Sequence, residues 1–224
     1  MALTVIILCG GKGQRLRPLT LKIPKPLIKV NKKSILEVIL EHLSKSKLEN
    51  VVLATGYKSY KFKRFIKVKF KNSFINVINS GDVDIIKRIN KCIKFISINE
   101  DFMVVYGDTI TDLNINKLIK SHKKNKKLVT VGLLRYKSQF GLMRTNKYNL
   151  VKQYQEKPIL DYWINIGYFY FSKKAISIIK RFETFEKFLS YIVKVGQLNG
   201  YKYSQSHYTV NNYSELLNLK KIFN

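Results

Sequence analysis

A short apolar strand followed by a glycine-rich turn constrains this chain more than any other feature. Residues 4–8, TVIIL, are an unbroken apolar run rich in β-branched side chains, which predicts a strand buried on both faces in the middle of a parallel sheet. Gly10, Gly11 and Gly13 follow it, and glycine lets backbone N–H groups approach a ligand closely. The sequence therefore predicts a central strand that ends in a phosphate-binding loop.

A basic segment rich in proline follows the glycines. Its cations are Arg15, Arg17, Lys22 and Lys25, and its prolines are Pro18, Pro24 and Pro26. Fixed positive charge at this density suits a triphosphate. Because proline fixes φ and restricts the residue before it, we expect this segment to be extended and not helical.

Other glycine motifs fit this turn less well. The spacing GGxGxR lacks the third glycine of the dinucleotide motif GxGxxG, and no acidic residue stands about twenty positions on to hold a ribose. A P-loop requires Ser or Thr after its lysine, but Gly13 follows Lys12. A simple turn with a solvated basic tail stays an alternative.

Strands and helices alternate along the first half of the chain. A Ser cap and a Glu three residues later predict the start of a helix at Ser34. This rhythm predicts an α/β fold with a mostly parallel sheet, whose ligands bind at the carboxyl ends of the strands. The expected helices are 34–43, 57–66 and 83–96, and the expected strands after residues 4–8 are 50–55, 74–78 and 102–106.

Aspartates follow two of these strands. Gly81-Asp82 comes after the third strand and Gly107-Asp108 after the fourth. An aspartate at the tip of a buried strand, beside a glycine that leaves room for a ligand, is well placed to hold Mg²⁺ between phosphates. The alternative is an aspartate that only caps the next turn.

The composition limits the number of domains, the binding partners and the cellular compartment that we expect. A length of 224 residues suits one domain, and two cysteines are too few for a disulfide framework. The formal charge of +28 would suit a nucleic-acid-binding protein. The lysines, however, are spread over the whole chain and not clustered in one segment. We expect no specific nucleic-acid partner and no membrane association. Without a signal peptide or a long apolar run, we also expect a cytoplasmic protein.

The run GGKGQRLRPLTLKIPKP, residues 10–26, resembles the signature GGxGTRLxPxTxxxPKP of the sugar-1-phosphate nucleotidyltransferases. Every defined position matches except Gln14, where the family usually has Thr. Tyr106-Gly107-Asp108 resembles the metal-binding motif of that family and is closest to its glucose-1-phosphate cytidylyltransferase branch. The resemblance implies a Rossmann-like three-layer α/β/α sandwich with a mixed, mostly parallel sheet.

The second half carries further resemblances to this family. Residues 140–143, FGLM, resemble its Tyr-Gly-Val segment, residues 156–158 match its Glu-Lys-Pro, and residues 163–169, WINIGYF, resemble its Trp-Ile-Asn-Gly-Gly-Phe-Phe strand. One domain is implied, with a nucleotide-binding half over about 1–112 and a sugar-phosphate-binding half over about 113–224. The positions implied to bind the sugar phosphate are Gly141, Glu156, Lys157, Asn165 and Gly167.

Three further departures from the family pattern, besides Gln14, bear on its chemistry. A Thr-Gly-Gly stretch that the cytidylyltransferase branch carries is missing near Asp82, and Ile166 replaces a glycine. The second metal-binding aspartate of the family falls at Thr209 by alignment. A hydroxyl is a poorer Mg²⁺ ligand than a carboxylate. Either Asn211 supplies the missing oxygen, the alignment is off by a residue or two, or catalysis is weakened.

The resemblance implies that a sugar 1-phosphate attacks the α-phosphorus of a nucleoside triphosphate, with CTP favoured, and that pyrophosphate leaves. Arg15 would hold the pyrophosphate, Lys25 the phosphates near the reacting centre, Asp108 the Mg²⁺, and Lys157 the sugar phosphate. The implied nucleotide-binding positions are Leu8, Gly10, Gly11, Gly13, Arg15, Lys25, Gly81, Asp82 and Gly107. Family members often form oligomers, so a homo-oligomer is possible.

Two alternatives stay open at this point. The enzyme could transfer the nucleotide to a non-sugar phosphate or phosphonate acceptor, as Ile166 and the shortened segment near Asp82 suggest. It could also be a catalytically weakened relative with a binding role, as Thr209, Gln14 and Ile166 suggest.

Overall fold

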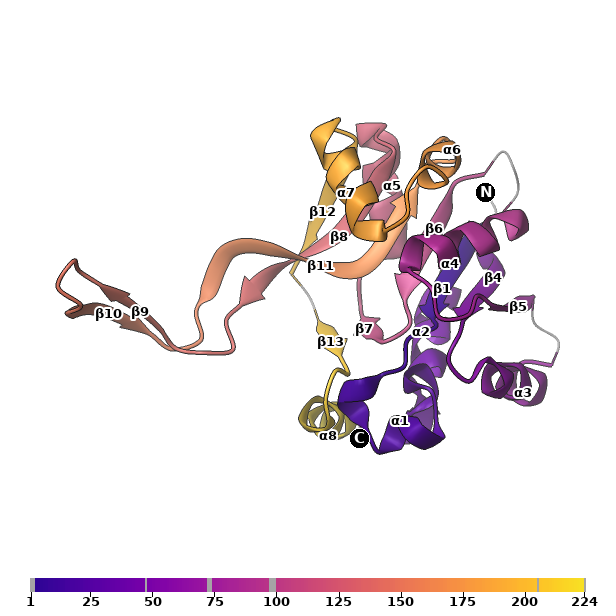
Figure 1. Cartoon of the computed structure of the whole chain (residues 1–224), viewed down its shortest axis with the longest axis horizontal. Helices are drawn as coiled ribbons and strands as arrows, with labels where there is room; N and C mark the ends of the chain where they lie inside the picture. The colour runs from indigo at the N-terminus through magenta and orange to yellow at the C-terminus, as the bar shows by residue number, and fades with distance from the viewer. Residues whose placement is uncertain (1–2, 47, 72–73, 97–99, 205, 224) are drawn as a thin grey trace.

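The computed structural model describes residues 3–46, 48–71, 74–96, 100–204 and 206–223. At its centre is a seven-stranded sheet with the strand order β12-β8-β11-β6-β1-β4-β5 (Figure 1). The strands are β1 (Leu3–Cys9), β4 (Leu48–Thr55), β5 (Ile75–Asn79), β6 (Phe102–Tyr106), β8 (Val129–Lys137), β11 (Ile159–Phe171) and β12 (Leu198–Tyr203).

The sheet is mixed and mostly parallel, as predicted. β1 lies parallel to both of its neighbours, β4 and β6, and the pairs β4–β5 and β8–β12 are parallel as well. Only β11 runs the other way, antiparallel to β6 and to β8 within this sheet. The carboxyl ends of β1, β4, β5 and β6 therefore meet at one edge, where the predicted loops lie.

Helices cover both faces of the sheet, which makes three layers. One face packs against α2 (Ile35–Ser44), α3 (Ser59–Lys69), α5 (Ile115–Asn125) and α8 (Tyr213–Ile222). The other face packs against α4 (Ile85–Cys92), α6 (Ala175–Ile179) and α7 (Phe185–Lys194). Beyond α4 a short turn, η3 (Ile93–Phe95), completes the helix expected over residues 83–96.

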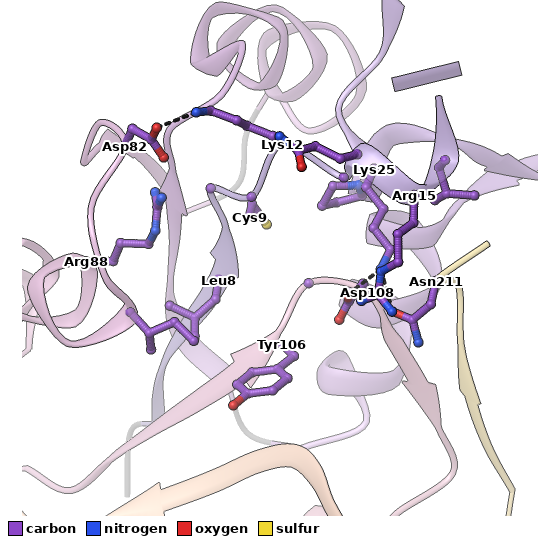
Figure 2. A pocket seen from close by; sticks show the side chains of 18 of the residues that line it. Leu8, Cys9, Lys12, Arg15, Lys25, Asp82, Arg88, Tyr106, Asp108 and Asn211 are labelled. Atoms are coloured by element: carbon purple, nitrogen blue, oxygen red, sulfur yellow. Dashed lines mark hydrogen bonds and ion pairs between the residues drawn. The ribbon is translucent and has the colours of Figure 1, made fainter. Parts of the chain in front are cut away.

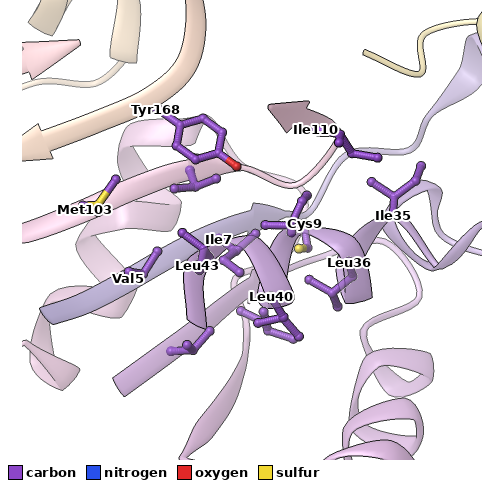
Figure 3. Packing of buried hydrophobic residues seen from close by; sticks show 14 of the residues in the cluster. Val5, Ile7, Cys9, Ile35, Leu36, Leu40, Leu43, Met103, Ile110 and Tyr168 are labelled. Atoms are coloured by element: carbon purple, nitrogen blue, oxygen red, sulfur yellow. The ribbon is translucent and has the colours of Figure 1, made fainter. Parts of the chain in front are cut away.

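β1 is buried on both faces, as its composition predicts. Val5 and Ile7 face the first layer of helices, whereas Ile6 faces the second, because successive side chains of a strand point to opposite sides. Figure 3 shows Val5 and Ile7 against Leu36 and Leu43 of α2. The end of β1 is thus held from four directions.

The basic segment after the glycines is not extended, contrary to expectation. It forms three single turns: η1 (Gln14–Leu16), α1 (Leu19–Lys22) and η2 (Lys25–Leu27). Pro18 occupies the N-cap of α1 and Pro26 lies within the first turn of η2. Proline is tolerated at these positions because a first-turn N–H has no helical partner. The prolines therefore divide the segment into turns.

Two short pairs of strands flank the sheet. β7 (Thr109–Thr111) follows Asp108 and pairs antiparallel with β13 (His207–Thr209), which brings the end of the chain beside the end of β6. β2 (Lys29–Val30) pairs with β3 (Lys33–Ser34) ahead of α2. No helix among the described residues is long and apolar enough to span a bilayer.

Residues 138–162 form an arm that stands clear of the body (Figure 1). It contains the ribbon of β9 (Leu142–Thr145) and β10 (Val151–Gln155), which pair antiparallel as a separate two-stranded sheet. The first residues of β11 complete the arm. The sequence did not indicate that this segment leaves the body.

Replacing Ser34 with Ala should destabilise the fold by about 1 kcal/mol, because it removes the N-cap of α2. The Ser34 hydroxyl accepts a hydrogen bond from the Glu37 N–H at 3.2 Å, and the Glu37 carboxylate accepts one from the Ser34 N–H at 2.7 Å. Urea unfolding measures the loss. Ser44→Ala, at the exposed opposite end of α2, is the control and should change stability by less than about 0.5 kcal/mol. Equal losses in both variants would contradict a capping role.

Candidate active site

A pocket of about 670 Å³ lies at the carboxyl ends of β1, β5 and β6. Figure 2 shows Lys25, Arg15 and Asn211 around Asp108, and Asp82 and Arg88 at the other end. The predicted site residues that line it are Leu8, Gly10, Gly11, Gly13, Arg15, Lys25, Asp82, Gly107 and Asp108. Loops from three strands thus converge on one cavity, as the parallel topology requires.

Each glycine of the loop has a different structural environment. Gly13 has φ of 61° and accepts a hydrogen bond from the Thr20 hydroxyl at 2.9 Å. Gly11 has open space where a side chain would be. A side chain at Gly10, however, would collide with the guanidinium of Arg88, since a Cβ there would lie 1.7 Å from Nη1. Gly10 therefore makes room for Arg88, and Gly11 leaves the loop open to a ligand.

Arg88 is a site residue that sequence reasoning missed. It is 6% exposed, and its Nη1 donates to the Ser80 hydroxyl at 2.9 Å and to the Thr55 carbonyl at 3.3 Å. Burial lowers its pKa, while the nearby carboxylates of Asp82 and Asp84 raise it. A signal was present: Arg88 falls on the apolar stripe of α4, three residues after Ile85 and one before Ile89.

Lys25 and Asp108 form the central ion pair of the pocket. The Lys25 ammonium lies 2.6 Å from Asp108 Oδ2 and 3.2 Å from Asn211 Oδ1. The Lys25 side chain is only 11% exposed and that of Asp108 32%, so water screens the pair less than it would at the surface. Three segments of the chain, η2, the end of β6 and the segment after β13, meet at this cation.

Asn211, and not Thr209, contacts the Lys25 ammonium beside Asp108. The Thr209 hydroxyl donates to the Glu215 carboxylate at 3.3 Å and accepts from the Asn211 amide nitrogen at 2.9 Å. This contact orients the Asn211 side chain so that its oxygen points to Lys25. Of these two residues, only Asn211 is part of the pocket lining among the described residues.

Asp108 and Asn211 are the residues that fit a divalent cation. Mg²⁺ takes oxygen ligands, and here a carboxylate oxygen and an amide oxygen already share one cation, the Lys25 ammonium. Within the described ranges, no group of three or more His, Cys, Asp or Glu side chains is arranged to hold a metal. A cation bound here would complete its shell with water and substrate phosphate oxygens.

Lys12 and Asp82 form an ion pair across the mouth of the pocket. Their side chains meet at 2.5 Å, and the hydrogen bond and charge of Lys12 lower the pKa of Asp82. Both are well exposed, with side-chain exposures of 48% and 71%, so the pair adds little stability. Gly81, with φ of 77°, forms the turn that presents Asp82.

Asn165 and Gly167 contact Tyr106, which lines the pocket and which we did not predict as a site residue. A side-chain hydrogen bond joins Tyr106 and Asn165, and burial raises the pKa of Tyr106. Gly167 has φ of 76°, and a Cβ there would lie 2.5 Å from the Tyr106 ring. Gly167 thus allows Tyr106 its position in the wall.

Gly141, Glu156 and Lys157 lie on the arm. Among the described residues, those that line the pocket do not include them. Glu156 accepts a hydrogen bond from the Tyr154 hydroxyl, and the Lys157 ammonium lies 3.7 Å from the Glu156 carboxylate. The structure therefore separates these residues from Asp108, although their motif predicts a shared site.

A glycine loop, fixed cations and an aspartate at the ends of parallel strands are the features that phosphate-binding α/β sites share. A family model described as nucleotidyl transferase matches residues 4–208. The chain is 28% identical, over 98% of its length and 95% of the relative's, to a probable glucose-1-phosphate cytidylyltransferase of Bacillus subtilis. It is 31% identical, over 82% and 83% of the two chains, to the D-glycero-alpha-D-manno-heptose 1-phosphate guanylyltransferase of Campylobacter jejuni.

The fold is shared with solved structures as well. A putative glucose-1-phosphate thymidylyltransferase from Bacillus anthracis superposes with a TM-score of 0.79 at 19% identity, over 98% of this chain and 94% of that one. The chain belongs to the nucleotidyl transferase family. The resemblance to sugar-1-phosphate nucleotidyltransferases is thereby confirmed, whereas the bases in these relatives' names differ.

Asn211→Asp should strengthen divalent cation binding by about tenfold or more, because it places a second carboxylate beside Asp108. Mn²⁺ titration followed by electron paramagnetic resonance measures the affinity without any turnover. Thr209→Asp is the matched control, since Thr209 contacts Glu215 and is not part of the pocket lining described. A larger gain with Thr209→Asp than with Asn211→Asp would reverse this assignment.

Proposed function

We propose that the protein transfers a nucleotidyl group from a nucleoside triphosphate, CTP being favoured, to a sugar 1-phosphate and releases pyrophosphate. The observation that carries this proposal is the meeting of the open glycine loop, Arg15, Lys25 and Asp108 in one pocket. Such a pocket neutralises and aligns phosphates, which is most of what this reaction asks of a protein.

The triphosphate would lie along the glycine loop. Backbone N–H groups near Gly11 and Gly13 and the guanidinium of Arg15 would hold the β- and γ-phosphates, while Lys25 would lie at the α-phosphate. The short turns η1 and η2 present these two cations from one side. Lys25 would neutralise charge that develops at the α-phosphate as pyrophosphate leaves.

The reaction needs no nucleophile from the protein. A phosphate oxygen of the acceptor forms the new bond to the α-phosphorus, and the bond from that phosphorus to the bridging oxygen breaks. The attacking oxygen is already ionised, so no general base is required. Cys9 lines the pocket, but burial raises the pKa of its thiol far above its usual range. This supports direct transfer without a cysteinyl intermediate.

Mg²⁺ is the proposed cofactor, held by Asp108 and Asn211. When bound, it would neutralise phosphate charge at the reacting centre. With one carboxylate instead of two, the protein supplies less negative charge to the metal, so we expect a higher Mg²⁺ requirement than two acids would give.

The base would lie at the opposite end of the pocket, near Arg88. Its guanidinium has five N–H donors and no acceptor, and only part of this capacity is used by Ser80 and Thr55. Cytosine offers O2 and N3 as adjacent acceptors, besides its N4 amino donor, whereas adenine has no two adjacent acceptors. This donor-only wall supports CTP over ATP and, with the cytidylyltransferase relative, motivates the choice of CTP.

Pyrophosphate release with Mg²⁺, across the common nucleoside triphosphates paired with hexose 1-phosphates, tests the proposal directly. We expect release with a sugar 1-phosphate and a preference for CTP. Asp108→Asn and Lys25→Ala should each lower turnover by about 10²-fold or more, because each breaks the central pair. Glu183→Gln, on an exposed surface pair, is the control.

Full activity in Asp108→Asn would contradict the site assignment. Retained nucleotide binding without turnover on any sugar 1-phosphate would instead favour a non-sugar phosphate acceptor or a binding role. Circular dichroism of each variant separates loss of activity from loss of fold.

Lys157 and Glu156 are proposed to bind the acceptor from the arm. Lys157 adopts φ of 43°, a left-handed conformation that costs energy in a residue before proline, and such outliers concentrate at functional sites. Motion of the arm would be needed to bring the Lys157 ammonium to the sugar phosphate. Gly141, Asn165 and Gly167 would shape the same acceptor region.

Lys157→Ala should raise the KM for the sugar 1-phosphate by about tenfold and leave the KM for the nucleotide nearly unchanged. Lys152→Ala, an exposed lysine of the same ribbon, is the matched control and should change neither constant. Steady-state kinetics with each substrate varied in turn makes the measurement. Equal effects of the two variants would show that Lys157 has no special role.

We also propose a cytoplasmic setting with a single functional domain divided at about residue 112. Cys9 and Cys92 are both free and buried, which suits a reducing compartment. The pocket draws most of its lining from the first half, which supports that half as the nucleotide-binding one.

A further inference from the structure

Two cations converge on one aromatic ring where β8 and β11 leave the body for the arm (Figure 1). The Lys202 ammonium lies 4.6 Å from the centroid of the Trp163 ring, and the guanidinium carbon of Arg135 lies 5.2 Å from it. A cation within about 6 Å of an aromatic centroid is attracted to the ring. Trp163 therefore holds two positive charges near each other.

The strand register fixes the face of the sheet on which this cluster lies. Residues opposite each other on neighbouring strands share a face, so Lys202, Leu133 and Asn165 form one row across β12, β8 and β11. Trp163 and Arg135 are opposite each other two residues along, in the next row of the same face. The cluster and Asn165 therefore belong to one surface.

This surface leads to the pocket. Leu133 and Tyr106 pack against the same core cluster, on the face that α4, α6 and α7 cover. Asn165 is hydrogen-bonded to Tyr106, which lines the pocket. Neighbouring strands lie about 4.8 Å apart, so β12 is three strands, or roughly 14 Å, from β6. The long side chain of Lys202 shortens this gap because it reaches the Trp163 ring on β11.

The cluster carries more positive than negative charge. Arg135 Nη1 lies 3.0 Å from the carboxylate of Asp161, whose side chain is 89% exposed. No carboxylate of the described ranges forms an ion pair with Lys202. Like charges held this close repel each other, and one solvated carboxylate offsets little of that repulsion. An anion that contacts both cations would relieve it.

The convergence on Trp163 distinguishes these cations from the other basic residues. With a net charge of +28, exposed lysines are common on this chain, and most of them need no ligand. Lys202 and Arg135 are also exposed, so a ligand can reach them, but the ring restrains both. A neutral sugar would gain little from two restrained cations, whereas a phosphate or carboxylate accepts hydrogen bonds from both.

We propose that the acceptor carries a second anionic group, remote from the phosphate that reacts, and that Arg135 and Lys202 bind this group. The inference rests on the proposed function, because it specifies the acceptor of that reaction. Trp163 positions the two cations, and Asn165 lies between them and the pocket. The second anionic group forms and breaks no bond; it selects the acceptor and orients it along the sheet.

Isothermal titration calorimetry in EDTA, with CTP present and no metal, tests the proposal without turnover. The probes are glucose 1-phosphate, glucose 1,6-bisphosphate and glucuronic acid 1-phosphate. At least one of the two doubly anionic probes should bind about tenfold or more tightly than glucose 1-phosphate. The better of the two shows whether the second group is a phosphate or a carboxylate.

Arg135→Gln and Lys202→Gln should each remove most of this preference and leave the affinity for glucose 1-phosphate nearly unchanged. Lys180→Gln, at the exposed C-cap of α6, removes the same charge elsewhere in the second half and should keep the preference. This control separates the position of a charge from the net charge of the chain. Circular dichroism checks the fold of each variant.

Fluorescence locates the bound anion independently of affinity. Trp163 is the single tryptophan of the chain, so its emission reports on this cluster alone. The preferred doubly anionic probe should change the emission of the wild type, and glucose 1-phosphate should change it far less. In Lys202→Gln the two probes should have similar effects.

Equal affinity for the three probes, no binding of any of them, or a preference that both cluster variants retain would overturn the proposal. Loss of the preference in Lys180→Gln would overturn it as well. Pyrophosphate release without any preference for a second anionic group would refute this inference and leave the proposed reaction standing. The preference without turnover on any acceptor would refute the reaction and not the anion site.

Discussion

The rest of the structure depends on the burial of β1 in the middle of the sheet. It is hydrogen-bonded to β4 on one side and β6 on the other, and helices cover both of its faces. A strand held from four directions has a rigid end, and loops on rigid scaffolds are where binding groups can be positioned accurately. The glycine loop starts at that end, and Asp108 follows the parallel neighbour β6.

The charged side chains of the pocket range from buried Arg88 to the exposed pair of Lys12 and Asp82. Arg88 fills the space beside Gly10, at the end of the pocket where the base is proposed to lie. Lys25 lies between Asp108 and Asn211, where a cation is balanced by a single formal negative charge. Lys12 and Asp82 pair at the exposed mouth, where a phosphate could replace Asp82 as the partner of Lys12 at little cost.

The arm differs from the body in how far its apolar side chains are buried. The body buries its apolar side chains between the sheet and the helices, whereas the arm presents Met143 and Tyr154 to solvent. The same segment carries Lys157, which the family motif associates with the acceptor. Acceptor binding as proposed therefore depends on where residues 138–162 lie relative to the body.

Local patterns in the sequence were enough to predict the core of the fold. The apolar run of β1, the Ser34 cap and the alternation of strands and helices predict an α/β sheet because each depends on neighbouring residues alone. The glycines, Lys25 and Asp108 were found for the same reason, since motif spacing brings chemistry to the ends of strands. The basic segment was predicted wrongly, because proline forbids long helices but permits single turns.

Contacts between distant segments were decided only by the tertiary structure. Arg88 reaches Gly10 across two loops, and Asn211 meets Asp108 because β13 pairs with β7. Likewise, Gly141, Glu156 and Lys157 lie away from the pocket because the chain leaves the sheet at the end of β8 and returns in β11. The sequence by itself determined the strand, the loop and the charges. Packing determined which of those charges face one another, since that depends on side chains far apart in the chain.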